Sequence, residues 1–389
     1  MHVGDKMKRL LYIRWTKFPD SSAMSARCLA LAKLFQLAGW EVLVLSRGSD
    51  NQRKIKEHEG VPYLSVSGHY QPRWNRAIDL LVRIPLFAKK LLKEQHFDGV
   101  FIGMINKSFL RSLKSVNLSN TSLFYDAVEW YSPSQFKNGE KSRTYRRNCN
   151  WITKGITSKY KVISISRYFE DYFNSRNIKT VRIPAVLDVD SVLYKKKLLE
   201  DRTVILYAGT PGKKDHLREM IEACATLTEE ERSKLEIKLI GVVKKDLVDQ
   251  CGVSLETLNI AGRSIKCMGR MPHEEVLKEL QQAHFTVLIR PEEERYAKAG
   301  FPTKVPESLA TGTPVMCNLS SDLGMYLKDG ENAIILQSRN VADVATGLRR
   351  ALNLTNDDKQ RMCVAARNTA EKYFDYKRYA NQLNELIHS

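Results

Sequence analysis

Residues 299–315, AGFPTKVPESLATGTPV, place an open turn, a lysine and a carboxylate within one short stretch. The turn at 300–302 and Gly312 predict a helix over 303–311, because glycine and proline commonly stand at helix ends. The first backbone N–H groups of a helix have no partner within it, so together with Lys304 they can bind an anion. Glu307, one turn later, cannot bind a phosphate but can accept two hydroxyl groups of a ribose.

This combination predicts a ligand in which a diphosphate is joined to a ribose, as in a nucleotide sugar. The alternative is an ordinary loop, helix and strand with no ligand. If the ligand interpretation holds, the contacting residues in this stretch are Gly300, Phe301, Pro302, Thr303, Lys304 and Glu307.

A second loop, AGTPGKKDHL (208–217), has the composition of an anion site. Gly209 allows the backbone to come close to a ligand, and Lys213 and Lys214 can reach phosphate oxygens. The loop follows a predicted strand, and open α/β sheets bind ligands at the carboxyl ends of their strands. We therefore expect Gly209, Thr210, Lys213 and Lys214 to contact the same diphosphate, with a solvated basic turn as the alternative.

Apolar runs alternate along the chain with helical segments that could position these loops. This alternation predicts mostly parallel sheets with helices on both faces, arranged as two Rossmann-like domains. The predicted strands are 10–15, 41–46, 98–103, 122–127, 161–166, 203–209, 235–241, 285–290 and 314–318. The predicted helices are 22–40, 77–97 with a bend at Pro85, 216–227, 272–283, 303–311, 340–353 and those of 356–389.

The segment RIPAVLDVDSVLYKK (182–196) joins two similar architectures in series. We place the first domain at 1–186 and the second at 187–373. The final helix, at about 374–389, is expected to cross back onto the first domain. Two domains suit a chain of 389 residues, since one domain commonly takes about 100–200 residues.

The net charge of +18 lies entirely in the first half. Residues 1–187 hold 32 Lys and Arg against 14 Asp and Glu, whereas residues 188–389 hold 30 of each. A basic domain suits an anionic membrane, an acidic substrate or nucleic acid. No RNA- or DNA-binding motif is visible, so nucleic acid is not an expected partner.

Two segments of the basic half have the composition of a membrane-surface site. Residues 137–161 combine eight Lys and Arg with Tyr145, Trp151 and Tyr160, and the helix at 77–97 is amphipathic and basic. Cationic and aromatic side chains together are typical of segments that lie on an anionic bilayer. The alternative for 77–97 is a helix that simply covers the sheet.

The N-terminal sequence has no signal-peptide pattern, and no apolar run approaches the roughly 18 residues of a membrane span. We therefore expect a cytoplasmic protein, peripheral on the inner face of the cytoplasmic membrane. The seven cysteines are scattered and form no CxxC pair. This spacing supports neither a disulfide framework nor a zinc site.

Four segments resemble the retaining GT-B glycosyltransferases of family 4. The strand–Gly–loop–Lys pattern of that family is similar to 209–214, and its segment beside the nucleotide base is similar to MGRMPHEEV (268–276). Its linker is similar to IPAVLD (183–188), and its acidic donor motif to 299–315. The resemblance spans essentially the whole chain and looks most like transferases that build bacterial surface polysaccharides.

The chain departs from the family pattern at three positions. The first Glu of the family's paired carboxylates falls at Ala299, so only Glu307 is kept. The family's Arg after the first strand glycine is Thr210, and the first-domain His of many members falls near Tyr125. The resemblance therefore does not identify which residue of this chain would stabilise the developing sugar cation.

The resemblance implies roles for further residues. Lys214 and the helix end would stabilise the leaving diphosphate in place of a metal, and Arg270 and Arg290 would contact the donor. Asp126 and Glu129 are candidates for contacting acceptor or sugar, with a loop-holding carboxylate as the alternative for each. For Arg290 the alternative is an ion pair with the glutamates at 292–294.

The DxD sequence at 188–190 resembles the metal site of a different transferase fold, but here it stands in the linker. We expect no metal and no cofactor. The implied activity is a metal-independent, retaining hexosyl transfer from a UDP- or GDP-linked sugar to a lipid-linked or oligosaccharide acceptor.

Three other functions remain open at this point. A nucleotide-sugar 2-epimerase shares the architecture, and Ala299 leaves room for a catalytically inactive carbohydrate- or lipid-binding scaffold. A dinucleotide-dependent oxidoreductase is disfavoured because no GxGxxG follows the first predicted strand.

Overall fold

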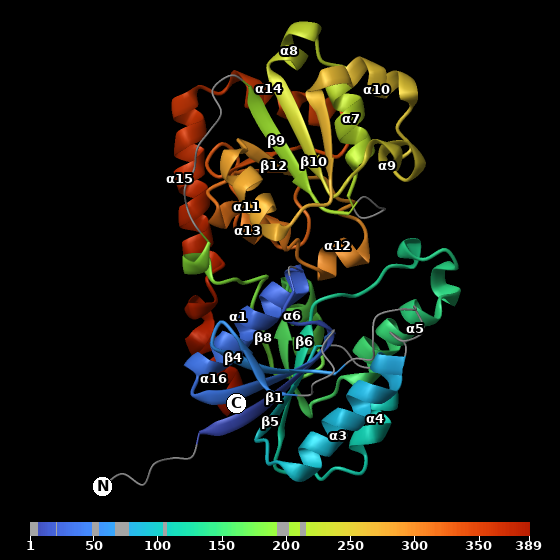
Figure 1. Ribbon diagram of the computed structural model, residues 1–389, viewed down its shortest axis with the longest axis vertical. Coiled ribbons are helices and arrows are strands. Elements are labelled where there is room, and N and C mark those ends of the chain that lie inside the picture. The colour runs from blue at the N-terminus through green and yellow to red at the C-terminus, as the bar shows by residue number, and fades with distance from the viewer. Residues whose placement is uncertain are drawn as a thin grey trace. The chain divides into compact units, whose positions relative to one another are not determined.

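The computed structural model describes residues 7–20, 22–48, 54–66, 78–103, 107–192, 202–210 and 215–389. The chain divides into two compact units, one of Met1–Leu187 with Tyr376–Ser389 and one of Asp188–Asp375. The second unit is therefore an insertion in the first, and the chain crosses between them twice. Where it crosses, the backbone N–H of Tyr376 donates to the carbonyl of Leu187 at 3.1 Å. Each unit contains a sheet flanked by helices (Figure 1).

The sheet of the first unit has eight strands in the order β3-β4-β2-β1-β5-β6-β7-β8. Neighbouring strands are parallel except β3 and β4. Residues 10–13 of β1 are fully buried, which explains why their apolar run is continuous rather than alternating. The strands are β1 (Lys8–Lys17), β2 (Trp40–Arg47), β3 (Lys56–His58), β4 (Val61–Ser65), β5 (Gly99–Ile102), β6 (Ser122–Ala127), β7 (Tyr160–Ser164) and β8 (Thr180–Arg182).

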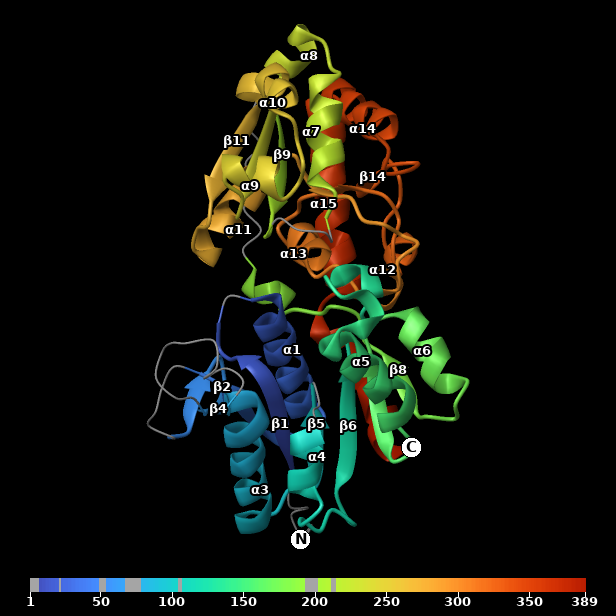
Figure 2. The same ribbon diagram turned by 90° about the vertical axis from the view of Figure 1, so that its right-hand side faces the viewer.

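Helices cover this first sheet. α1 (Ala23–Leu37) begins after Ser22, whose hydroxyl accepts a hydrogen bond from the N–H of Ser25. α1 and α16 (Ala380–His388) share one apolar cluster with β1. α3 (Ile84–Glu94) packs against α4 (Lys107–Leu113), as Figure 2 shows. Two further helices are α5 (Arg143–Asn150) and α6 (Arg167–Asn174).

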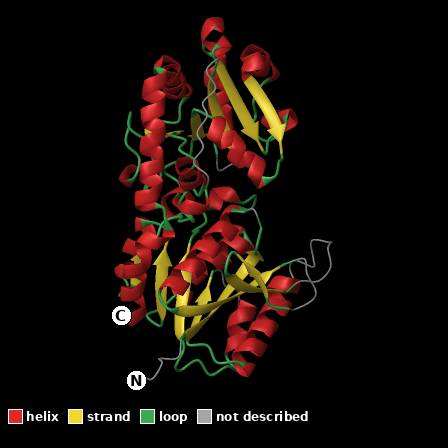
Figure 3. Cartoon of the chain, turned by 60° about the vertical axis from the view of Figure 1, so that its left-hand side comes forward, coloured by secondary structure: helices red, strands yellow, loops and turns green. Residues whose placement is uncertain are grey.

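The sheet of the second unit has six parallel strands in the order β11-β10-β9-β12-β13-β14. The chain order reverses between β9 and β12, and ligands bind at such a switch point in open parallel sheets. Figure 3 distinguishes the strands from the surrounding helices. The strands are β9 (Thr203–Ala208), β10 (Leu235–Ile240), β11 (Ile265–Gly269), β12 (Phe285–Leu288), β13 (Val315–Cys317) and β14 (Ala333–Ile335).

Helices cover both faces of the second sheet. α7 (Leu217–Ala225), α10 (Leu255–Ala261) and α14 (Val341–Asn353) share a core cluster with one face. α11 (His273–Gln282) packs on the other face against Val204 and Leu206. The remaining helices are α8 (Glu229–Ser233), α9 (Lys244–Asp249), α12 (Arg295–Ala299), α13 (Lys304–Ala310) and α15 (Asn356–Tyr373).

The prediction of two parallel-sheet domains is confirmed, but several elements differ. The helix predicted over 77–97 is a π-helix at Asp79–Arg83 followed by α3, with Pro85 in the first turn of α3. The short strands β3, β4, β8, β11 and β14 were not predicted. Among the described residues, none of the helices is long and apolar enough to span a membrane.

Candidate functional site

Three glycines pack together at the carboxyl edge of the second sheet. Gly209 follows β9, Gly241 follows β10, and Gly269 ends β11. The N–H of Gly241 donates to the carbonyl of Gly269 at 2.6 Å. Gly241 has a φ of +82°, and a Cβ there would lie 2.3 Å from the carbonyl oxygen of Gly209. Gly241 must therefore be glycine for the loop after β9 to keep its position. Sequence reasoning selected Gly209 but missed Gly241.

Four side chains converge beside Gly209. Asp215 accepts from the Nζ of Lys304 at 2.6 Å, from the Nε of Arg290 at 3.1 Å and from the hydroxyl of Tyr207 at 2.8 Å. The Lys304 ammonium also lies 4.2 Å from the centre of the Tyr207 ring. A Cβ on Gly209 would lie 2.3 Å from Lys304 Nζ, so the glycine leaves the space that this ammonium fills.

The residues of this cluster come from separate segments that the sheet brings together. Tyr207 is in β9, Asp215 precedes α7, Arg290 follows β12 and Lys304 begins α13. These segments meet at the switch point between β9 and β12. Arg290 and Lys304 were predicted to contact the donor, whereas Asp215 and Tyr207 were not identified as site residues.

The electrostatics of the cluster keep Asp215 ionised. Burial alone would raise the pKa of the Asp215 carboxyl, but Lys304 and Arg290 outweigh it and lower that pKa to about 2. Burial and the neighbouring carboxylate raise the pKa of the Tyr207 phenol. Tyr207 therefore stays protonated and donates its hydrogen bond to Asp215.

Arg290 is held by its backbone as well as by Asp215. Its N–H donates to Asn318 Oδ1 at 2.9 Å, and Asn318 Nδ2 donates to its carbonyl at 2.7 Å. The ion pair of its guanidinium is with Asp215. The alternative that we considered, a pair with the glutamates at 292–294, is thus not what the geometry shows.

Glu307 lies on the same short helix as Lys304 and pairs with His273. His273 Nε2 and Glu307 Oε1 are 2.5 Å apart, and the two side chains are 42% and 31% exposed. The hydrogen bond to Glu307 raises the pKa of His273 above its usual value, against the opposing effect of partial burial. Arg270 is exposed three residues before His273. Sequence reasoning selected Glu307 and Arg270 but missed His273, which stands in the quoted segment 268–276.

The turn before α13 is more deeply packed than the sequence predicted. Ala299 is fully buried, and Phe301 packs against Tyr326 and Phe374 with ring centroids 5.8 Å from each. Phe301 therefore anchors the turn before α13 in the core of the second unit. α13 has only seven residues, so its dipole is small and Lys304 supplies most of the positive charge.

Some predicted residues lie elsewhere or outside the described part. Lys213 and Lys214 lie outside the described residues, as does the rest of 211–214. Thr210 is exposed, and its carbonyl accepts from the Tyr207 hydroxyl at 3.3 Å. The DxD carboxylates flank Val189 in a short 3-10 turn. Within the described ranges, no three His, Cys, Asp or Glu side chains gather as metal ligands.

In the first unit, Asp126 is fully buried. Its carboxylate accepts from Arg27 at 2.8 Å and from Arg14 at 3.1 Å, and Arg27 continues to the carbonyl of Ile183 at 3.2 Å. This geometry favours the alternative role, a carboxylate that holds the ends of strands and loops. Glu129 is half-buried, and its backbone carbonyl accepts from the Asn148 amide at 2.9 Å.

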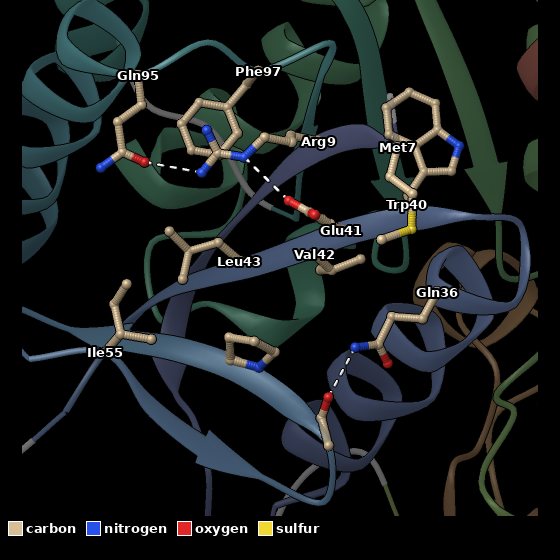
Figure 4. Close-up of a pocket in the computed structure, with 12 residues that line it drawn as sticks. Met7, Arg9, Gln36, Trp40, Glu41, Val42, Leu43, Ile55, Gln95 and Phe97 are labelled. Atoms are coloured by element: carbon tan, nitrogen blue, oxygen red, sulfur yellow. Dashed lines mark hydrogen bonds and ion pairs between the residues drawn. The ribbon is translucent and has the colours of Figure 1, made fainter. Parts of the chain in front are cut away.

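A cavity of about 510 Å³ opens at the other end of the first sheet, where its strands begin (Figure 4). Arg9 lines this cavity, with its Nε 3.5 Å from Glu41 Oε2 and its Nη2 donating to Gln95 Oε1 at 3.1 Å. None of the predicted site residues lines this cavity. A smaller one, of about 160 Å³, adjoins Asp215 in the second unit.

Residues 191–369 match the family model described as Glycosyl transferases group 1. This segment contains the glycine loops, the Asp215 cluster and the Glu307–His273 pair. No curated protein sequence matches the chain.

Solved structures share the fold over nearly the whole chain. Sucrose-phosphate synthase from Thermosynechococcus elongatus has a TM-score of 0.75 at 16% identity and covers 98% of both chains. Anabaena HepE in complex with UDP-glucose has a TM-score of 0.67 at 14% identity, over 98% of this chain and 99% of its own. WaaG, a glycosyltransferase involved in lipopolysaccharide biosynthesis, has a TM-score of 0.68 at 13% identity, over 97% and 99%. The chain therefore shares the GT-B fold of these structures, as its motifs predict, and the part of it at 191–369 is similar to the group 1 glycosyltransferases.

Proposed function

We propose that the chain is a glycosyltransferase that binds a UDP- or GDP-linked sugar on its second unit and transfers the sugar with retention of configuration. The observation that carries the proposal is that two cations, Lys304 and Arg290, meet at Asp215, and that Glu307 follows Lys304 on α13. Cations suit a diphosphate, and a carboxylate one helical turn from Lys304 suits the hydroxyls of a ribose. The UDP-glucose complex of HepE, a structural neighbour, is consistent with such a donor.

The cations would act at the leaving group. As the bond between the sugar and the diphosphate breaks, negative charge grows on the diphosphate oxygens. Fixed positive charges at that point stabilise the transition state more than the bound donor. Lys304 and Arg290 are held in place for this role, and Lys214 is proposed to assist. We further propose that Gly209, Thr210 and Arg270 line the donor.

The acceptor is proposed to be a lipid-linked or growing oligosaccharide of a bacterial surface polysaccharide. The structural neighbour WaaG acts in lipopolysaccharide biosynthesis, which supports this class of acceptor. The excess positive charge of the first unit would attract the diphosphate of a lipid carrier or an anionic leaflet.

The segment at 79–94 supports attachment to the inner face of the cytoplasmic membrane. Leu81, Val82 and Leu86 are 39%, 46% and 57% exposed, and Lys89 and Lys90 lie on the same segment. Exposed apolar side chains beside lysines are typical of a helix on an anionic bilayer. Residues 137–161 give weaker support to membrane attachment, because Trp151 and Tyr160 are each only 9% exposed.

Titration calorimetry of UDP, GDP and ADP tests the donor site. We expect one of the three to bind, and no binding by any of them would refute the proposal. Mixing that donor's sugar form with a lipid-linked acceptor then separates transfer from epimerisation, because an epimerase converts the donor without an acceptor. Donor hydrolysis without acceptor would exclude the inactive scaffold.

Flotation with liposomes tests the membrane part. Binding should require anionic lipid and weaken with salt, because the attraction is screened within about 8 Å at physiological ionic strength. Leu86→Ser should weaken it, whereas the matched change Val364→Ser, at an exposed apolar residue of the second unit, should not. Binding that is independent of salt would argue against the role of the lysines.

A further inference from the structure

Asp215 has a position that the donor chemistry does not by itself explain. A carboxylate beside a diphosphate repels it, yet Asp215 lies between the two cations that the donor needs. Its side chain is 8% exposed, whereas those of Arg290 and Lys304 are 15% and 31% exposed. The carboxylate is therefore the least exposed of the three side chains.

The hydrogen bonds leave most of the cationic donors available. Arg290 uses only its Nε–H on Asp215, and Lys304 uses one of its three ammonium N–H groups. Among the described residues, no other side chain or carbonyl accepts from the terminal nitrogens of Arg290 or from Lys304. One carboxylate between two cations also leaves a net charge of one positive unit at the end of β9 and β12.

From this geometry we infer that Asp215 is a positioning residue for the donor diphosphate. It holds the Nε–H of Arg290 and one N–H of Lys304, which leaves their remaining N–H groups for the ligand. Tyr207 completes the arrangement by donating to the same carboxylate oxygen as Lys304. This inference rests on the proposed donor site, and it adds two residues that do not themselves contact the diphosphate.

The charge of Lys304 supports the same role. Burial lowers the pKa of the Lys304 ammonium and Arg290 lowers it further, whereas Asp215 and Glu307 raise it. The Tyr207 phenol beside it stays neutral. Removing the carboxylate of Asp215 leaves Lys304 next to Arg290 with only Glu307 to compensate. Lys304 then loses its proton at a lower pH, and diphosphate binding weakens as the pH rises.

The test is calorimetric binding to the full chain, with UDP as the probe from about pH 7 to about pH 9, where its terminal phosphate has already lost its last proton, near pH 6. Inorganic pyrophosphate is measured at about pH 7 only, because its own last ionisation falls toward the alkaline end of this range. Asp215→Asn should weaken the binding of both probes by about tenfold at about pH 7, and that of UDP by more at about pH 9, since charge-assisted hydrogen bonds are lost. Wild type should change less over this range. Binding of uridine alone should be unaffected.

A second change isolates the proton on Lys304. Lys304→Arg in the Asp215→Asn background should remove the added pH dependence, because a guanidinium keeps its charge in proteins. Equal affinity and an equal pH profile for wild type and Asp215→Asn would overturn the inference. If wild type binds neither pyrophosphate nor any of UDP, GDP and ADP, the proposed donor site fails instead, and the two failures are thus distinguishable. If GDP is the diphosphate that binds, it replaces UDP as the probe.

Thermal unfolding of each variant shows whether it is folded. If Asp215→Asn does not fold, Tyr207→Phe decides the matter, because it removes only the hydroxyl that donates to Asp215. It should weaken pyrophosphate binding in the same direction but by less. Unchanged pyrophosphate binding by a folded Tyr207→Phe would then count against the positioning role.

Discussion

Each unit contains a carboxylate between two cations, but the cations are fully buried in the first unit and partly exposed in the second. In the first unit Asp126 lies between Arg14 and Arg27, and in the second Asp215 lies between Arg290 and Lys304. Each cluster has one carboxylate and two cations near the carboxyl ends of parallel strands. Charge pattern alone therefore does not distinguish a structural cluster from a binding site.

The two clusters differ in how deeply they are buried and in how many of their hydrogen-bond donors are already used. The three side chains of the first cluster are at most 2% exposed. Their further donors reach the Tyr12 hydroxyl and the carbonyls of Ile183 and Pro184. In the second cluster the cations are partly exposed and keep donors for a ligand. The first cluster thus holds strands and linker together, whereas the second has the donors that the proposed anion site needs.

The largest expected effect would come from breaking the buried cluster. Asp126→Ala should lower the free energy of unfolding of the first unit by about 3–5 kcal/mol, because it leaves two guanidiniums buried without their carboxylate. Urea denaturation measures this loss. Asp215→Ala, in the more exposed cluster, is the control and should cost clearly less. Comparable losses from the two changes would erase the distinction drawn between the clusters.

The next effect concerns the diphosphate. Lys304→Met should weaken UDP binding by about 10- to 100-fold, since a hydrogen bond to a charged group contributes about 1.5–3 kcal/mol. Binding of uridine should not change. Calorimetry with both ligands measures this difference, and Lys298→Met, on neighbouring α12, is a matched lysine control. A similar loss with UDP and uridine would contradict a phosphate role for Lys304.

A smaller effect is expected at the ribose. Glu307→Ala should weaken UDP and uridine alike, by about tenfold, because each loses hydrogen bonds to a carboxylate. The 2′-deoxy and 3′-deoxy forms of UDP should be less affected by the change than UDP itself. Glu274→Ala, a nearby carboxylate at the start of α11, should have no effect on either ligand. Full affinity of Glu307→Ala for UDP would remove the ribose assignment.

The smallest effect is a pH dependence of stability from His273 and Glu307. Because the folded pKa of His273 is raised, the pair's contribution is fully present below the unfolded pKa of about 6.5 and is lost as pH rises through the folded pKa. Both side chains are about one-third or more exposed, so solvent screening keeps the contribution below about 1 kcal/mol. His273→Gln should flatten the pH profile of unfolding in this window. An unchanged profile would show that the pair contributes nothing.

Much of the fold could be predicted from local sequence. Continuous apolar runs such as 10–13 and 203–207 belong to strands buried on both faces, and the observed strands contain them. β3 was missed because Lys56–His58 has no apolar alternation and pairs only at the sheet edge. The helix at 77–97 was predicted as one element, because periodicity does not distinguish a π-helical turn from an α-helical one.

The site was predicted less completely, for a physical reason. Gly209, Lys304 and Glu307 could be selected because glycine loops and helix starts have local signatures. Asp215 and Lys304 are 89 residues apart in sequence, and His273 and Glu307 are 34 apart. Such pairs are formed by the sheet topology, which spacing does not reveal. Asp215 and His273 nevertheless stand within segments, 208–217 and 268–276, that had been selected for other reasons, whereas Tyr207 and Gly241 do not.

The hydrogen bond between Tyr376 and Leu187 joins the two points at which the chain leaves and re-enters the first unit. The second unit is therefore an insertion whose two ends are adjacent in space. Domains with adjacent ends tolerate insertion into another domain. If the proposed donor site is correct, exchanging 188–375 between related chains should thus transfer donor recognition and leave the sheet of the first unit, with the buried cluster at Asp126, unchanged.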